Sequence, residues 1–178
     1  AALATHSRLD RMNILVTGGA GYIGSITATT LLEHGHGVVV LDDLSTGHRA
    51  AVPDEAAFVH ADIADVGAVL GALGTYHVDA VVHFAAASLV GESMADPVRY
   101  YRNNVSGSIA LLDAVTQAGV KRFVLSSTAA LYGTPSAVPI PETATIAPES
   151  VYGETKFAIE RMLGWLARTT GLGFAALR

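Results

Sequence analysis

The 178-residue sequence contains no cysteine, so it can form neither a disulfide framework nor a thiolate metal site. Its seven histidines are scattered, and no two of them share a helix at a metal-ligand spacing, so no metal site is predicted. No apolar run approaches the roughly 20 residues that span a bilayer, so no membrane segment is expected.

Charged residues are also sparse. They make up 15% of the chain with a formal net charge of -5, and no basic stripe is present, which argues against a nucleic-acid partner. Apolar residues reach 51%, which excludes disorder and suits a sheet buried on both faces. The length suits one domain.

The first eleven residues, AALATHSRLDR, contain two arginines and an aspartate but no apolar core, so they do not resemble a secretory signal. We expect Met12 to be the natural start, residues 1–11 to be an extension outside the fold, and residues 12–178 to form the domain. The cytoplasm is the expected compartment.

From Met12 onward, short β-branched runs alternate with stretches of helical period, which is typical of a parallel sheet with helical crossovers. The sequence predicts a Rossmann-like, doubly wound α/β sheet of about six strands with helices on both faces. The strands are expected to be apolar on both faces, at residues 13–17, 37–42, 57–62, 79–85, 122–127 and 174–178. Helices are expected at 23–34, 65–73, 97–118 and 151–170, and a long polar loop at 134–148.

A glycine-rich segment, TGGAGYIGS (17–25), lies between the first strand and the first helix. Gly18, Gly21 and Gly24 allow a tight turn, a close approach of a pyrophosphate to the backbone, and close packing of helix on strand. The helix N-terminus would add unpaired N–H groups and the positive end of its dipole. The segment predicts a dinucleotide site, and the alternative is a tight turn that binds no ligand.

The second predicted strand ends at Asp42, 18 residues beyond Gly24. An acidic side chain here can accept hydrogen bonds from the adenosine ribose and repel a 2′-phosphate, which predicts NAD over NADP. The adjacent Asp43 leaves the assignment ambiguous, because either carboxylate could instead cap the turn.

Near the C-terminus, VYGETK places Tyr152 and Lys156 one helical turn apart, downstream of the hydroxyls in SSTAALYG (126–133). A free tyrosine has a pKa of about 10, and a nearby lysine cation would favour its ionised form. Such a spacing alone is common on solvated helices. Its place after the fifth strand of a nucleotide-binding sheet favours a catalytic pair.

Together these segments resemble the extended short-chain dehydrogenase/reductase family, and among its members the UDP-glucose 4-epimerases most closely. The resemblance also covers VVVLDDLSTG, VHFAAASLVGES and YYRNNVSGSIALL. It implies that a UDP-hexose is epimerised at C4 by transient hydride transfer to tightly bound NAD. In that reaction Thr128 would be the catalytic hydroxyl, Tyr152 the base, and Lys156 the residue that holds the nicotinamide ribose. The implied cofactor-binding residues are Gly18, Gly21, Tyr22, Ile23, Gly24, Asp42, Thr46, Asp62, Ile63, Phe84, Ala85, Asn103, Tyr152 and Lys156.

The chain departs from the family pattern in two ways. Ser88 stands where many members have a lysine, and the sequence ends at Arg178, before the C-terminal domain that clamps the uridine diphosphate. A non-catalytic NAD-binding fragment is therefore one alternative. A nucleotide-sugar 4,6-dehydratase or decarboxylase is the other, disfavoured because Ala129 and Ala130 stand where an acid is expected.

Family members often dimerise through two helices from each subunit. Here these helices would be 97–118 and 151–170. The apolar residues on these helices would either contact the other subunit or pack against the sheet: Ile109, Leu112, Ile159 and Leu163.

Overall fold

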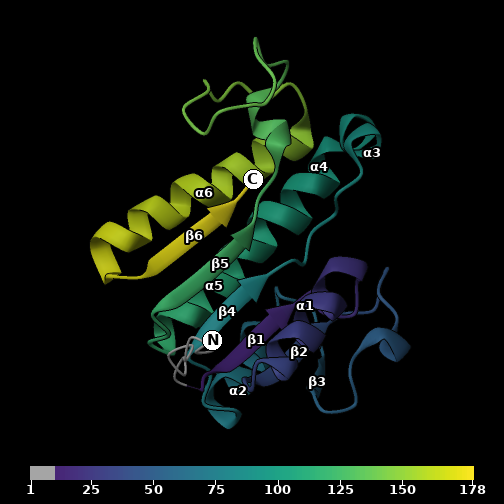
Figure 1. Cartoon of the computed structure of the whole chain (residues 1–178), viewed down its shortest axis with the longest axis vertical. Coiled ribbons are helices and arrows are strands. Elements are labelled where there is room, and N and C mark those ends of the chain that lie inside the picture. The colour runs from purple at the N-terminus through teal and green to yellow at the C-terminus, as the bar shows by residue number, and fades with distance from the viewer. Residues whose placement is uncertain (1–10) are drawn as a thin grey trace, which may run out of the picture.

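The computed structural model describes residues 11–178, so all but the last residue of the expected extension at 1–11 lies outside the described part. Within it, six strands form one parallel sheet in the order β3-β2-β1-β4-β5-β6 (Figure 1). This order confirms the predicted doubly wound, Rossmann-like sheet. The strands are β1 (Asn13–Thr17), β2 (Gly37–Asp42), β3 (Ala57–His60), β4 (Ala80–His83), β5 (Arg122–Ser126) and β6 (Gly173–Leu177).

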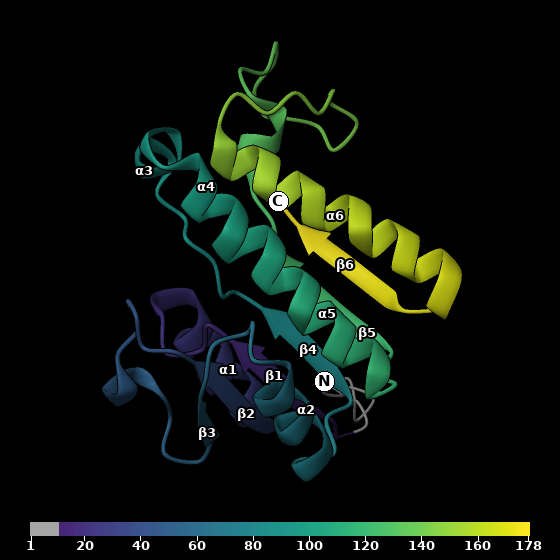
Figure 2. The same ribbon diagram turned by 180° about the vertical axis from the view of Figure 1, so that it is seen from behind.

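Helices lie on both faces of the sheet. The principal ones are α1 (Tyr22–Glu33), α2 (Val66–Thr75), α5 (Gly107–Gln117) and α6 (Val151–Thr170). Helices α2, α5 and α6 lie on the face turned to the viewer in Figure 2, and α1 lies on the other. Accordingly, Leu15 of β1 packs into one apolar cluster and its neighbours Ile14 and Val16 into the second. The alternation follows from the period of two along a strand.

Four strands differ from prediction at their ends. The first two match, but β3 and β4 stop at His60 and His83, because the chain turns there into the loops that form the site described below. Strand β4 also begins one residue late, at Ala80. Strand β5 ends one residue early, and β6 begins and ends one residue early. The expectation that every strand is buried is wrong for the two edge strands, because most of β6 is exposed and no residue of β3 is fully buried.

The predicted helix at 97–118 is not a uniform α-helix. It consists of α4 (Pro97–Tyr100), a π-helical segment (Tyr101–Ser106) and α5. A further short helix before it, α3 (Val90–Ala95), was not predicted. The other helices match within two residues, and the loop at 134–148 contains no helix or strand, as expected.

The apolar residues on the candidate dimer helices mostly cover the sheet. Leu112, Ile159 and Leu163 are buried in the core, whereas Ile109 is 47% exposed. Only Ile109 of these four is therefore available for contact with another subunit. Among residues 11–178, no helix combines the length and apolarity that crossing a bilayer requires.

Candidate nucleotide and catalytic site

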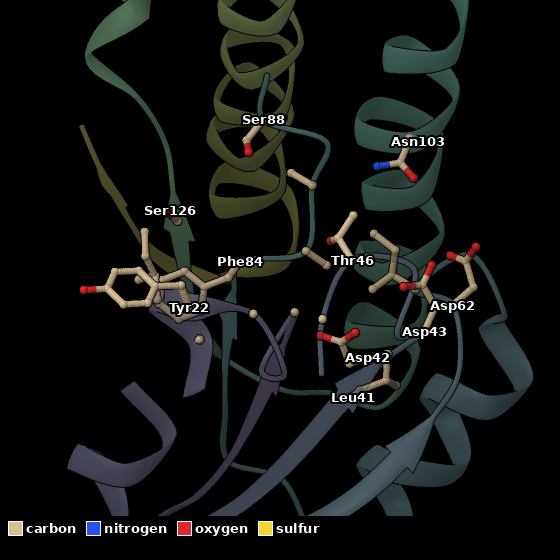
Figure 3. A pocket seen from close by; sticks show the side chains of 18 of the residues that line it. Tyr22, Leu41, Asp42, Asp43, Thr46, Asp62, Phe84, Ser88, Asn103 and Ser126 are labelled. Atoms are coloured by element: carbon tan, nitrogen blue, oxygen red, sulfur yellow. The ribbon is translucent and has the colours of Figure 1, made fainter. Parts of the chain in front are cut away.

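A cavity of about 400 Å³ opens at the C-terminal edge of the sheet, where open α/β folds bind ligands (Figure 3). It extends from the carboxylates beyond β2 and β3 to Ser126 at the end of β5. All residues predicted to bind cofactor line it: Gly18, Gly21, Tyr22, Ile23, Gly24, Asp42, Thr46, Asp62, Ile63, Phe84, Ala85, Asn103, Tyr152 and Lys156. Lining residues that the prediction did not include are Leu41, Asp43, Gly47, Ala61, Ala86, Ser88 and Ser126.

The glycine turn is closed by backbone contacts that leave no room for side chains. Gly18 has a φ of 69°, and a Cβ on it would lie 2.5 Å from the amide nitrogen of Ala85. A Cβ on Gly24 would lie 2.2 Å from the carbonyl oxygen of Gly18. Helix α1 begins after Gly21 with no side-chain cap, so its first amides have no side-chain acceptor. The turn therefore presents backbone donors to the cavity.

The two adjacent carboxylates at the other end of the cavity differ in environment. Asp42 is 7% exposed and accepts the amides of Ala20 at 3.0 Å and Leu44 at 2.8 Å. Asp43 is exposed and accepts the amide and hydroxyl of Ser45. Asp42 thus stabilises the turn by accepting two backbone amides, which is the capping role considered as the alternative to ribose binding. Each of its oxygens retains a second acceptor site, because a carboxylate oxygen can accept two hydrogen bonds.

Tyr152 and Lys156 lie in the first turns of α6, which begins after a Ser150 cap. Lys156 is 2% exposed, and its Nζ donates to the carbonyl of Ser126 at 2.9 Å. Thr128 caps the short helical turn Ala129–Tyr132, and its Oγ1 accepts the amide of Ala130 at 3.1 Å. Helix α6 therefore brings the lysine to the end of β5. Thr128, two residues beyond Ser126, is not among the residues that line the cavity.

The acid–base properties of this pair are dominated by burial. Burial raises the pKa of the Tyr152 phenol, and a hydrogen bond from Thr128 opposes that rise. Burial lowers the pKa of Lys156 to about 8. Lys156 is not among the groups that shift the pKa of Tyr152, and its Nζ is hydrogen-bonded to the Ser126 carbonyl instead.

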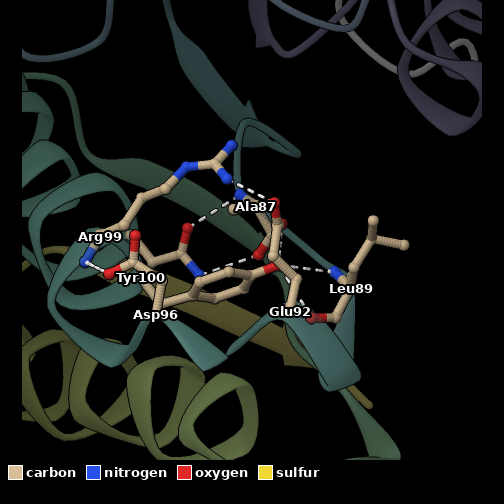
Figure 4. Close-up of polar contacts among 7 residues, drawn as sticks. Ala87, Leu89, Glu92, Asp96, Arg99 and Tyr100 are labelled. Atoms are coloured by element: carbon tan, nitrogen blue, oxygen red, sulfur yellow. Dashed lines mark hydrogen bonds and ion pairs between the residues drawn. The ribbon is translucent and has the colours of Figure 1, made fainter. Parts of the chain in front are cut away.

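The cavity wall at Ala85–Leu89 is held by side chains of α3 and α4 (Figure 4). The buried Tyr100 hydroxyl accepts the amide of Leu89 at 3.0 Å and lies 2.8 Å from both the Leu89 carbonyl and Glu92 Oε2. Hydrogen bonds from Tyr100 and Arg99 lower the pKa of Glu92. Their contacts fix the loop that carries Ser88 into the cavity.

The sequence interpretation selected Asn103, which lines the cavity, and gave no role to Asn104. Asn104 is buried and bonds both backbone groups of Ala87, at 2.9 and 3.0 Å, and the hydroxyl of Thr155 at 3.1 Å. Thr155 in turn donates to the carbonyl of Tyr152. Asn104 therefore joins the cavity wall to α6, which gives a reason for the π-helical turn around it. The paired asparagines inside a helix were the available sequence signal.

His83, at the end of β4, is fully buried behind Lys156 and bonds the hydroxyls of Thr17 at 2.7 Å and Ser108 at 3.0 Å. Burial first, and the charge of Lys156 second, lower its pKa from 6.5 to about 3. Between those values the unfolded chain binds more protons than the folded one, so stability falls as the pH is lowered through this window.

We expect His83 to reduce the free energy of unfolding by about 2 kcal/mol between pH 7 and pH 5. Urea unfolding of the wild type and of His83→Gln at both values isolates this contribution, because glutamine retains hydrogen-bonding groups but does not titrate. An equal loss in both proteins would show that His83 is not the group responsible.

Residues 14–178 match the NAD dependent epimerase/dehydratase family. UDP-glucose 4-epimerase of Lacticaseibacillus casei is 50% identical over 167 residues, which are 94% of this chain and 50% of that protein. The enzyme of the same name from Halalkalibacterium halodurans is also 50% identical, with the same coverage. The chain thus spans about half the length of the curated relatives it matches.

Solved structures give the same result. UDP-glucose 4-epimerase from Brucella ovis in complex with NAD has a TM-score of 0.91 and 46% identity, over 94% of this chain and 51% of that one. The Thermotoga maritima enzyme with UDP-glucose has a TM-score of 0.89 and 39% identity, over 94% of this chain and 55% of that one. By sequence and by fold, the chain belongs to the NAD dependent epimerase/dehydratase family.

Proposed function

We propose that the chain is the NAD-binding part of an enzyme that epimerises a UDP-hexose at C4, interconverting UDP-galactose and UDP-glucose. The observation that carries the proposal is the single cavity that joins the glycine turn to Tyr152 and Lys156. The similarity to UDP-glucose 4-epimerases supports it, including structures solved with NAD and with UDP-glucose.

The residues present fit NAD. The glycine turn is tightly packed, because a Cβ on Gly18 or Gly24 would collide with backbone atoms of the protein. It leads into the uncapped N-terminus of α1, where a pyrophosphate would gain backbone hydrogen bonds and the helix dipole. Asp42 at the end of β2 and Thr46 just after it would bind the adenosine ribose. Asp62 and Ile63 would lie beside the adenine. Phe84 and Ala85 would line the groove between these ends, and Asn103 would lie beyond them on the helical wall.

When bound, NAD would supply a reversible acceptor for the hydride on the sugar C4. Tyr152 would remove the proton of the 4-hydroxyl, with the Thr128 hydroxyl stabilising the tyrosinate by the hydrogen bond that already lowers its pKa. Lys156 would hold the nicotinamide ribose. Its cation would also favour the tyrosinate once the ammonium turns from Ser126 toward the phenol.

The test is NMR-monitored conversion of UDP-galactose by the 178-residue chain with added NAD. Appearance of UDP-glucose supports the epimerase. A 4-keto product that has lost water would favour the dehydratase instead. NAD binding without turnover would indicate a cofactor-binding part that needs further residues to hold the nucleotide sugar.

We also propose that the chain prefers NAD to NADP, because Asp42 and Asp43 both line the cavity and would repel a 2′-phosphate. We expect NAD to bind at least about tenfold more tightly, which corresponds to roughly 1.4 kcal/mol. Competition titration at fixed ionic strength measures the ratio. Tighter binding of NADP would overturn the assignment of these carboxylates.

The helices at 97–118 and 151–170 are proposed to form a homodimer contact. Exposed apolar side chains on them support this proposal: Val98, Tyr101, Ile109 and Trp165. The molar mass in solution tests it, and a monomeric mass across the micromolar range would reject it.

A further inference from the structure

Two side-chain hydrogen bonds fix the end of β5 to α6. Tyr152, Lys156 and Glu160 follow one another at intervals of four residues, so they share one face of the helix. Lys156 donates to the carbonyl of Ser126, and the Ser127 hydroxyl donates to Glu160 Oε1 at 2.5 Å. Next to Ser127, Thr128 lowers the pKa of Tyr152 through a hydrogen bond. The contact of Glu160 has no part in the proposed reaction so far.

Glu160 is a buried carboxylate with a matched counter-ion. It is 8% exposed, and Arg178 Nε and Nη2 approach its two oxygens at 3.1 and 2.6 Å. Such a paired, planar geometry leaves the carboxylate little freedom to rotate. A third nitrogen of Arg178, Nη1, donates to the Tyr132 hydroxyl at 2.9 Å, at the end of the helical turn that Thr128 begins.

Ser127 is therefore held from two directions. Its amide donates to the carbonyl of Leu177 in β6 at 2.7 Å, while its hydroxyl is fixed by Glu160 in α6. Thr128 is the next residue in the chain. One of the two contacts that hold its neighbour Ser127 therefore comes from a residue two helical turns away from Tyr152.

We propose that Glu160, with Arg178 as its counter-ion, is a positioning residue that holds the Thr128 hydroxyl against Tyr152. Glu160 touches neither the cavity nor Tyr152, so it acts through Ser127. The importance of this contact for catalysis rests on the proposed function, but the contact itself can be tested without turnover.

The readout is the titration of Tyr152, followed by the ultraviolet absorbance of tyrosinate. The absorbance of the same protein with Tyr152→Phe added is subtracted, so that only the signal of Tyr152 remains. Because the Thr128 hydrogen bond lowers the pKa of Tyr152, a displaced Thr128 raises it. We expect Glu160→Ala to move the midpoint up by about one to two units, the size of one lost hydrogen bond to the charged form.

Glu154→Ala is the matched control, because Glu154 is an exposed glutamate on the same helix and should leave the midpoint unchanged. Ser127→Ala removes the linking hydroxyl with little change in volume and is expected to give the same upward shift. It keeps the test decisive if Glu160→Ala fails to fold. A purely structural role would lower only the unfolding temperature, so an unshifted Tyr152 midpoint in either folded variant overturns the proposal.

The titration requires neither NAD nor a sugar. If the variants shift the Tyr152 midpoint but the wild type converts no UDP-galactose, the positioning role of Glu160 is supported and the proposed function fails. Turnover with an unshifted midpoint would support the proposed function and overturn the role of Glu160.

Discussion

Replacing Tyr152 with phenylalanine is expected to lower kcat for UDP-galactose conversion by about 10²- to 10⁴-fold, the usual contribution of a positioned acid–base group. The substitution removes only the hydroxyl from a half-buried side chain on α6. Because the ring that lines the cavity remains, we expect NAD affinity to fall far less than kcat. Conversion followed by NMR and a parallel equilibrium titration with NAD measure the two quantities separately.

Tyr76→Phe is the matched control for this substitution. Tyr76 follows α2 and precedes β4, so it lies at the opposite edge of the sheet from the cavity, and the cavity lining does not include it. It should retain full turnover. A Tyr152→Phe protein that converts substrate at the rate of the wild type would exclude the tyrosine as the base.

In the proposed mechanism, the size of this effect depends on an electrostatic change that accompanies NAD binding. In the chain by itself, burial raises the pKa of Tyr152, which is the wrong direction for a base at neutral pH. Lys156 stands one turn away with its Nζ on the Ser126 carbonyl. If the proposed mechanism holds, turnover requires the cationic form of Lys156, whose pKa is about 8. The rate should therefore fall above that pH.

The parts of the fold that follow from local pattern were predictable. The strand at 13–17, the glycine turn and the strand at 37–42 have the predicted bounds because apolar runs, glycine spacing and the terminal acid are contiguous in sequence. Residues predicted to bind cofactor come from separate segments yet line one cavity. The order of the strands brings their C-terminal ends to a common edge.

The features that the sequence did not predict depend on partners distant in the chain. The π-helical segment is stabilised where Asn104 meets Thr155, 51 residues away. The contacts of Glu160 cannot be inferred from α6 alone, because its partners Arg178 and Ser127 lie 18 and 33 residues away in the chain. Strand β6 has the composition of a buried strand but lies at the edge of the sheet, a position that no local pattern encodes.

Substituting alanine for Gly24 is expected to lower the free energy of unfolding by about 3 kcal/mol and to weaken NAD binding. The added Cβ would lie 2.2 Å from the carbonyl oxygen of Gly18 and 2.8 Å from the Cα of Gly19. Both are backbone atoms of the same tight turn, so neither can move without opening it. Because the turn presents the amides of α1 to the cavity, stability and affinity should fall together.

Gly164→Ala separates this clash from the general effect of alanine in a helix. Gly164 lies inside α6, and a Cβ there meets no other atom within 4 Å. Since alanine is the better helix former, this variant should gain roughly 0.5–1 kcal/mol. Urea unfolding of both proteins, extrapolated linearly to water, should thus give changes of opposite sign. A Gly24→Ala protein as stable as the wild type would mean that α1 does not pack on the glycine turn at this distance. The backbone cradle proposed for the pyrophosphate would then lose its structural basis.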